Sequence, residues 1–164
     1  MYEMKREINK QKYCLILHDI RSVYNVGAIF RTADAAGISK IYLTGLTPTP
    51  FDRFGRKRKD FAKTALGAED SVSWEKKENI ELLISNLKKE KFKIVAVEQA
   101  ENSVDYKKIK GQKLAIMMGN EVNGIPAEIL KKCDQIAEIP MKGKKESLNV
   151  SVAAGIVIFR VLNI

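Results

Sequence analysis

Several residue types are scarce in this chain of 164 residues, and each scarcity narrows the function. There are only two cysteines and one histidine, which disfavours a disulfide framework and excludes a histidine-rich metal site. Both cysteines, Cys14 and Cys133, lie in apolar stretches, a pattern typical of buried free thiols in a reducing compartment. We therefore expect no bound metal, and a cytoplasmic protein.

Long hydrophobic runs are also missing. The most apolar segment, 150–162, contains Ser151 and Arg160 and is shorter than the ~20 residues that a bilayer-spanning helix requires. The first twelve residues, MYEMKREINKQK, lack the apolar core of a secretory signal. We interpret 150–162 as a buried helix and 1–12 as a basic N-terminal arm, and we expect no membrane contact.

Acidic residues are outnumbered by basic ones. The chain has 29 Lys and Arg against 20 Asp and Glu, a formal charge of +9 at pH 7. This surplus favours a polyanionic partner such as nucleic acid, with simple solubility as the plainer explanation. Part of the charge is concentrated in RFGRKRK at 53–59, which supplies Arg53, Arg56, Lys57, Arg58 and Lys59, interleaved with Phe54 and followed by Phe61. This run, and likewise Lys144 in the KGKK segment, is either an RNA contact or a solvated loop.

Apolar runs of strand length alternate with helical periodicity along the chain. Strands are predicted at 13–17, 40–43, 71–74, 92–97, 114–118 and 136–139. Helices are predicted at 25–36, 79–89, 126–132 and 147–162. The alternation predicts an α/β fold with a mainly parallel sheet flanked by helices, in a single domain over 1–164.

The common nucleotide-binding motifs GxxxxGK[ST] and GxGxxG are absent. Three loops remain as candidates, because ligands of open α/β sheets bind beyond the carboxyl ends of the strands. In the first, Arg31 follows an Asn-Val-Gly helix opening and either pairs with Asp34 or grips an anion. The second, MMGNEVNGIP at 117–126, is either a ligand loop or a plain strand-to-helix turn. In the third, 139–155, the polar SLN group either caps a helix or lines a pocket.

These loops also carry a resemblance. NVGAIFRTADAAGI, GNEVNGIP and IPM followed by SLNVSVAAG, in that order, resemble the three signature motifs of the SpoU/TrmH family of RNA ribose 2′-O-methyltransferases, and KTALGAE at 63–69 is similar to a further family segment. The resemblance extends over 13–162. It implies S-adenosylmethionine-dependent methylation of a ribose 2′-hydroxyl in tRNA or rRNA, a C-terminal trefoil knot, and a homodimer with active sites near the interface. A non-catalytic RNA-binding protein on the same scaffold is the alternative.

The resemblance also assigns roles to individual positions. It implies the catalytic residues Asn25, Arg31, Glu121, Ser147 and Asn149. It implies the donor-pocket residues Val97, Glu98, Gln99, Gly119, Ile139, Met141, Ser147 and Leu148. Because a guanidinium stays protonated, we expect Arg31 to clamp an RNA phosphate and to stabilise the emerging alkoxide rather than to act as a base, with its side chain facing the donor.

Overall fold

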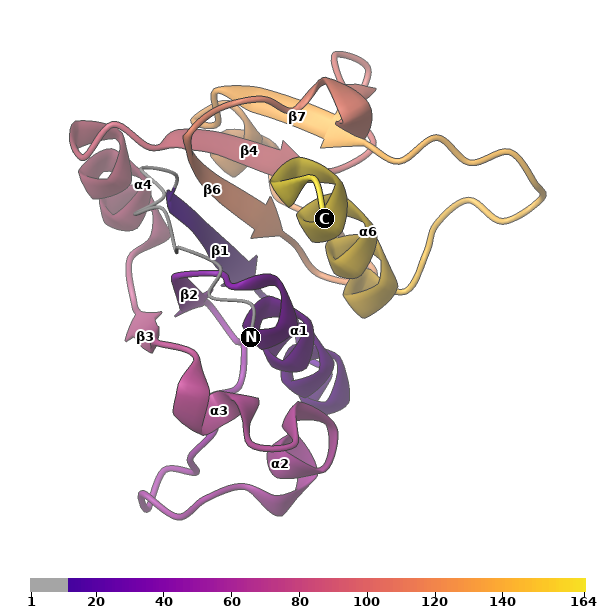
Figure 1. The fold of residues 1–164 in the computed structure, drawn as a ribbon. Helices are drawn as coiled ribbons and strands as arrows, with labels where there is room; N and C mark the ends of the chain where they lie inside the picture. Colours follow the sequence, from indigo (N-terminus) through magenta and orange to yellow (C-terminus); the bar gives the residue numbers. More distant parts are fainter. Residues whose placement is uncertain (1–11) are drawn as a thin grey trace, which may run out of the picture.

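The computed structural model describes residues 12–164 of the chain. Over these residues seven strands, all paired in parallel, form one sheet in the order β3-β2-β1-β6-β4-β7-β5 (Figure 1). The strands are β1 (Lys12–His18), β2 (Lys40–Thr44), β3 (Trp74–Lys77), β4 (Lys93–Val97), β5 (Val104–Asp105), β6 (Lys113–Met118) and β7 (Gln135–Glu138). Apart from Lys12, which begins β1, the predicted N-terminal arm lies outside the described residues.

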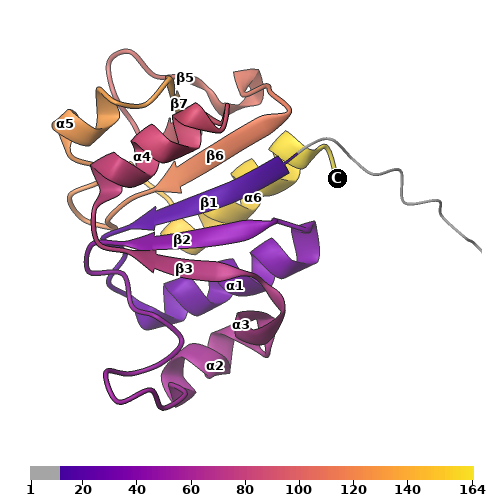
Figure 2. The same ribbon diagram turned by 90° about the vertical axis from the view of Figure 1, so that its left-hand side faces the viewer.

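Helices cover both faces of the sheet (Figure 2). They are α1 (Val23–Ala36), α2 (Lys59–Ala65), α3 (Ala68–Ser71), α4 (Ile80–Lys89), α5 (Ala127–Leu130) and α6 (Val150–Leu162), with a short 3₁₀ turn, η1 (Tyr106–Lys108). Along β1, Leu15 and Leu17 pack in the core shared with α1 and α6, whereas Cys14 and Ile16 pack against α4. The fully apolar strands are therefore covered on both sides, and the predicted α/β class is confirmed.

Helix α1 forms where the sequence predicts a helix. It begins after Ser22, whose Oγ accepts a hydrogen bond from the Asn25 backbone N–H at 3.2 Å, and it ends at Gly37 with φ 76°. Its apolar stripe, which includes Phe30, is buried in the core. Phe61 of α2 packs edge-on against Phe30, with ring centroids 5.0 Å apart, and is fully buried. Phe61 is thus a core residue and not part of an RNA-binding surface.

The connection after β2 departs from the prediction. It contains the short helices α2 and α3, and the strand expected at 71–74 is displaced to 74–77. Ser71 ends α3 instead, where its Oγ donates a hydrogen bond to Asp34 Oδ1 at 2.7 Å. Every residue of β3 is only half-buried, because β3 is an edge strand held by its backbone pairing with β2. It therefore lacks the apolar alternation on which the prediction depended.

Two C-terminal helices are shorter than predicted. Helix α5 stops at Leu130, because the chain turns there and Asp134 accepts a hydrogen bond from the Ile94 backbone N–H at the edge of β4. Helix α6 begins at Val150, since Asn149 caps it, and Ser147 lies in the preceding loop. Strand β5 is two residues long, too short for a sequence pattern to reveal.

Both cysteines are free thiols, as predicted, but only Cys14 is fully buried, and Cys133 is half-buried. Burial raises the pKa of Cys14 to about 12 and that of Cys133 to about 11, so both stay protonated at neutral pH. Within residues 12–164, no helix has the length and apolar character needed to cross a membrane.

Candidate active site

A cleft of about 320 Å³ lies beyond the carboxyl ends of β4, β6 and β7 and beside the start of α6. Every residue that the sequence suggested for the donor pocket lines it: Val97, Glu98, Gln99, Gly119, Ile139, Met141, Ser147 and Leu148. These residues come from three segments that are far apart in the sequence. The cleft is therefore the place where the second and third motifs meet the end of β4.

The lining of this cleft combines apolar walls with carboxylates. Met118, Ile139 and Leu148 supply apolar surface. The acidic residues on its wall are Glu98, Glu121, Glu138 and Glu146. On a chain of net charge +9, such a lining suits a ligand that has an apolar body and carries positive charge.

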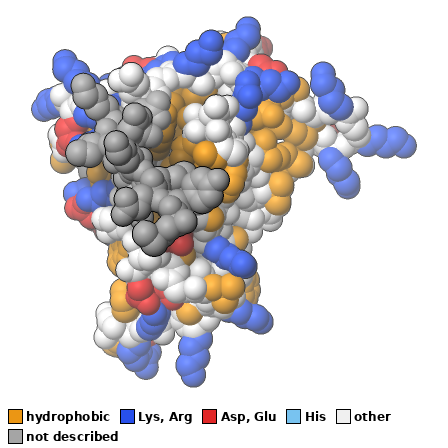
Figure 3. All heavy atoms as spheres, viewed as in Figure 1, with side chains coloured by type: hydrophobic (Ala, Val, Ile, Leu, Met, Phe, Trp, Pro, Cys, Tyr) orange, Lys and Arg blue, Asp and Glu red, His pale blue; other side chains and the backbone are white. Residues whose placement is uncertain are grey.

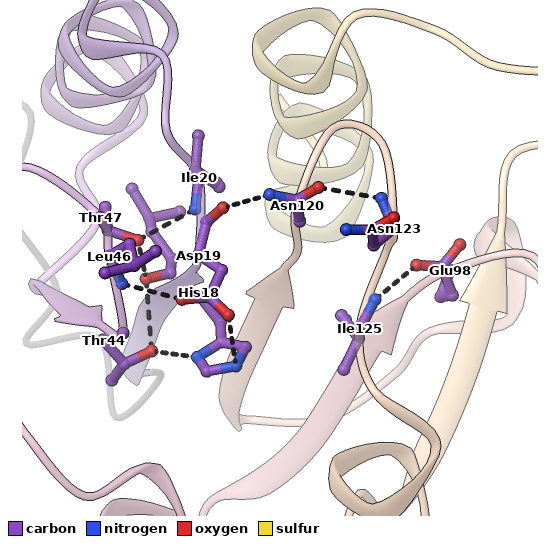
Figure 4. A network of polar contacts seen from close by, with 12 residues as sticks. His18, Asp19, Ile20, Thr44, Leu46, Thr47, Glu98, Asn120, Asn123 and Ile125 are labelled. Atoms are coloured by element: carbon purple, nitrogen blue, oxygen red, sulfur yellow. Dashed lines mark hydrogen bonds and ion pairs between the residues drawn. The ribbon is translucent and has the colours of Figure 1, made fainter.

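Glu98 is held in place by two backbone hydrogen bonds. Its Oε2 accepts from the Ile125 N–H at 3.0 Å (Figure 4). Its Oε1 accepts from the Gln99 N–H at 2.9 Å. The adjacent Gly124 has φ 67°, and a Cβ at that position would lie 2.2 Å from Glu98 Oε2. The glycine is therefore required both by its backbone conformation and by the close approach of this carboxylate.

Asn120 connects the second motif to the end of β1 (Figure 4). Its Oδ1 accepts hydrogen bonds from the backbone N–H groups of Val122 and Asn123, each at 2.9 Å. Its Nδ2 donates to the Asp19 carbonyl at 2.8 Å. One side chain thus shapes the loop 119–124 and fixes it beside the entrance to α1.

The three motifs meet in a second polar network. The Glu121 carboxylate accepts from the backbone N–H groups of Arg21 and Ser22 and from Asn25 Nδ2, each at 3.3 Å. Asn25 Oδ1 in turn accepts from Asn149 Nδ2 at 3.2 Å. Glu121 also lines the cleft. Three predicted catalytic residues from the three motifs are thereby joined at one edge of the cleft.

The loop before α6 closes one side of the cleft. Gln99 Nε2 donates to the Glu146 carbonyl at 2.6 Å, which ties this loop to the end of β4. Ser147 lines the cleft, whereas Asn149 caps α6 through a hydrogen bond from the Ser151 N–H at 2.8 Å. Asn149 therefore combines both alternatives, since its Oδ1 caps the helix while its Nδ2 donates to Asn25, whereas Ser147 only lines the cleft. Lys144 lies exposed at the tip of this loop.

Arg31 is not part of this cleft. It is exposed on α1 and lines a separate groove with Lys63 of α2 and Phe159 of α6. Within residues 12–164 its guanidinium forms no ion pair, so the alternative of a pair with Asp34 is not observed. The expectation that Arg31 faces the donor is not met within one chain. Arg31 lies six positions after Asn25 along the helix, a rise of about 9 Å.

Sequence reasoning did not single out Lys63 or Phe159 as neighbours of Arg31. Lys63 lies in the KTALGAE segment, whose family likeness was the available signal. Phe159 lies in a helix that is apolar nearly throughout, so its exposure could not be read from the pattern.

The basic run 53–59 is largely paired within the chain. Lys57 contacts Glu69 at 3.3 Å and Asp70 at 2.7 Å. Arg56 contacts Asp52 at 2.8 Å, and Arg58 contacts Asp60 at 3.0 Å. Arg53 and Lys59 are exposed and form no ion pair in the described part of the chain. The run is therefore neither a uniform RNA surface nor a uniformly solvated loop.

The single histidine of the chain lies beneath the start of α1 (Figure 4). His18 is buried, with Nδ1 2.9 Å from Thr44 Oγ1 and Nε2 3.5 Å from Asp19 Oδ2. Burial lowers the pKa of His18 below its ordinary 6.5, and the opposing effect of Asp19 is smaller. No cluster of three or more metal-ligating side chains occurs over 12–164.

This histidine makes stability depend on pH. Below about pH 6.5 the unfolded chain binds a proton that the folded state resists, so the free energy of unfolding is expected to fall as pH drops through that value. The melting temperature should decrease between about pH 7.5 and about pH 5.5, and the decrease should be smaller in His18→Asn, which keeps a hydrogen-bond donor toward Thr44. Thermal unfolding at both pH values measures this. Equal decreases in the two proteins would contradict it.

The site and the fold together define a class of protein. The cleft lies beyond the strand ends of a parallel α/β sheet, the position at which proteins with such open sheets bind small molecules. Residues 12–159 match the SpoU rRNA Methylase family, and the chain belongs to this family. The resemblance found in the sequence is thereby confirmed.

The most informative relatives are bacterial RNA-modifying enzymes. The 23S rRNA (guanosine-2′-O-)-methyltransferase RlmB of Escherichia coli (strain K12) is 35% identical over 150 residues, which are 91% of this chain and 59% of that protein. The AdoMet-bound rRNA methyltransferase of Sinorhizobium meliloti has a TM-score of 0.78 and 30% identity, covering 91% of this chain and 55% of the other. The A. aeolicus TrmH/SpoU tRNA modifying enzyme has a TM-score of 0.81 and 27% identity, covering 93% of this chain and 75% of the other. The chain spans about three fifths of the length of the curated relatives it matches.

Proposed function

We propose that this chain catalyses the S-adenosylmethionine-dependent methylation of a ribose 2′-hydroxyl in tRNA or rRNA. The observation that carries the proposal is the hydrogen-bonded series Asn149–Asn25–Glu121 at the edge of the donor cleft. It joins residues from three motifs around a space where a hydroxyl could be aligned with a methyl donor. The names of the relatives, RNA methyltransferases acting on rRNA or modifying tRNA, support the same substrate class.

The cleft fits the proposed donor. Ile139 and Leu148 offer apolar surface to an adenine ring, and the carboxylates Glu98 and Glu121 suit the positive charge of the molecule. S-adenosylmethionine would supply a methyl group already activated by the adjacent sulfonium. What remains for the chain is to align the ribose hydroxyl with that group and to assist the loss of its proton.

We assign Arg31 to the RNA. Its exposed position on α1, without an ion pair in the described residues, suits a fork-like contact to a phosphate and stabilisation of the developing alkoxide. Arg31 lies outside the cleft of its own chain. A complete site would therefore combine the Arg31 of one chain with the cleft of a second chain.

A homodimer would supply that second chain. Hydrophobic side chains are exposed over α6, next to the groove of Arg31 (Figure 3). Val152, Ile156 and Phe159 follow one another at helical spacing on this face. An apolar helix face of this kind is typical of an interface between copies of a chain. We therefore place the dimer contact along α6, in a single-domain protein working in the cytoplasm.

We further propose that the C-terminal part of the chain is threaded as a trefoil knot. Family membership supports this. The chain path is compatible with it, because β7 lies beyond β4 in the sheet while α6 packs against α1 on the far side of β6. The loop 139–149 must therefore lead the chain back across the carboxyl ends of β4 and β6 (Figure 1).

Three measurements test the activity. Calorimetry should detect S-adenosylmethionine binding in the cleft, labelled methyl groups should transfer to total RNA, and the product should contain a linkage that resists nuclease and alkali. Donor binding without any transfer would favour a non-catalytic RNA-binding protein. Absence of both donor binding and transfer would overturn the proposal.

A variant of Asn149 tests the network itself. Asn149→Ser keeps a side-chain cap for α6, since serine and asparagine cap helices about equally well, but it removes the Nδ2 donor to Asn25. The rate of methyl transfer should fall roughly tenfold, which corresponds to the loss of one hydrogen bond in the aligned state. The protein should remain folded, with the free energy of unfolding lowered by no more than about 1 kcal/mol. An unaltered rate would remove Asn25 and Asn149 from the catalytic set.

A further inference from the structure

An ordered loop between β2 and α2 presents an aromatic ring to solvent. This loop, residues 51–58, is called the Phe54 loop. The Phe54 side chain is 66% exposed, and the guanidinium carbons of Arg53 and Arg56 lie 4.8 and 5.1 Å from its ring centre. The loop leaves the carboxyl end of β2, and because the strands are parallel this is the same edge of the sheet at which the cleft lies (Figure 2). A ring displayed in this way packs on no core of its own chain.

Asp52 gives the loop a fixed shape. Its Oδ1 accepts from the backbone N–H groups of Phe54 and Arg56 at 2.8 and 2.9 Å, and its Oδ2 accepts from Arg56 Nε at 2.8 Å. The backbone hydrogen bond from Arg56 is the largest cause that lowers the pKa of this carboxyl below its usual range. Gly55 takes φ 75°, which closes the turn. The exposed ring is therefore carried by a built turn.

The base of the loop is anchored as well. Phe51 packs against Trp74 of β3, with ring centres 6.2 Å apart, and is bridged to Lys57 through the backbone. Lys57 pairs with Glu69, which is buried, and Arg58 pairs with Asp60. These cations stabilise the loop, which leaves Arg53 as the cation at its tip that has no carboxylate partner within residues 12–164.

We propose that Phe54 is a stacking platform for an unpaired nucleobase of the RNA substrate, with Arg53 leaving its position over the ring to contact a neighbouring phosphate. Exposed aromatic rings beside arginines bind single-stranded nucleic acid by stacking on the base face, which every base offers. In a continuous duplex both faces of each base are covered, so the ring has no partner there. The inference rests on the proposed function and narrows it. The substrate is an RNA that has an unpaired nucleotide, in a loop or a bulge, at the place where the RNA contacts residues 51–58.

The stacking proposal is tested with two RNA probes and with two variants of Phe54. The probes are a short RNA stem-loop with 2-aminopurine in its loop and a blunt duplex of the same stem. Wild-type protein should prefer the stem-loop and quench the fluorescence of 2-aminopurine. Phe54→Ala should weaken stem-loop binding roughly tenfold and abolish the quenching, whereas Phe54→Trp should retain both. Because the ring carries no charge, Phe54→Ala should leave the salt dependence of binding unchanged, while Arg53→Gln should reduce its slope by about one.

The outcomes separate this inference from the proposed function. Equal binding of stem-loop and duplex by the wild-type protein, or full affinity and quenching in Phe54→Ala, would overturn the stacking platform and point to a protein partner for the ring. Neither result bears on donor binding by the cleft, which calorimetry measures independently. Since Phe54 is exposed, Phe54→Ala should unfold at the wild-type temperature, which excludes misfolding as the cause of weakened binding.

Discussion

Replacing Arg31 by lysine is expected to lower the rate of methyl transfer by about 10²-fold or more while leaving the affinity for S-adenosylmethionine unchanged. Lysine keeps the positive charge but loses the planar fork that can hold two phosphate oxygens at once. The second half of this expectation follows from the partner assigned to Arg31. A guanidinium that holds an RNA phosphate should affect the aligned state of the RNA rather than the binding of the donor.

Single-turnover rates with saturating donor, together with calorimetry, measure the two quantities. A near-normal rate for Arg31→Lys would refute the phosphate clamp. A loss of donor affinity of similar size would instead place the guanidinium against the donor.

The strands of the central sheet could be predicted because each is specified by the residues of its own short segment. The strand cores 13–17 and 114–118 are nearly continuous apolar runs, and such runs occur where strands are covered on both faces. Helix α1 was similarly evident, since Gly37 ends an apolar stripe at helical spacing. In each case a few neighbouring residues suffice to specify the element.

The segment 45–77 was predicted poorly because its order comes from distant contacts. Helix α2 has seven residues and buries chiefly Phe61 and Ala65, too few for a periodic pattern. What holds it is its close approach to α1, including a hydrogen bond from Thr64 Oγ1 to the Tyr24 carbonyl at 3.0 Å. Residues 40 positions apart carry no signal of this in a single sequence.

The same distinction applies to the site. The position of the cleft followed from the rule that ligands bind beyond strand ends, together with the motif likeness, and all eight residues suggested for a donor pocket line it. The groove of Arg31 did not follow, because it depends on where α2 and α6 pack. The ion pairs of Lys57 and Arg58 could not be predicted either, because the sequence shows which residues are charged but not which of them lie close together in the fold.

Substituting alanine for Gly27, the glycine of the Asn-Val-Gly opening, should destabilise the protein by about 2 kcal/mol and lower its melting temperature by roughly 4–8 °C. A Cβ at this position would lie 2.1 Å from Thr64 Oγ1 and 2.7 Å from the Phe61 carbonyl oxygen. The hydroxyl can rotate away, but the carbonyl belongs to the backbone of α2. Helix α2 must therefore move, and Phe61 then loses its packing against Phe30.

Gly155 of α6 is the matched control. Its added Cβ would meet only Thr32 Cγ2 at 3.8 Å, an ordinary contact, so Gly155→Ala should stabilise the protein by up to about 1 kcal/mol through helix propensity. Adding Thr64→Ala to Gly27→Ala should restore only part of the lost stability, because the carbonyl clash remains. Thermal unfolding at one fixed protein concentration compares the variants. If Gly27→Ala were as stabilising as Gly155→Ala, the close contact of α1 and α2 would be wrong, and with it the placement of Lys63 beside Arg31.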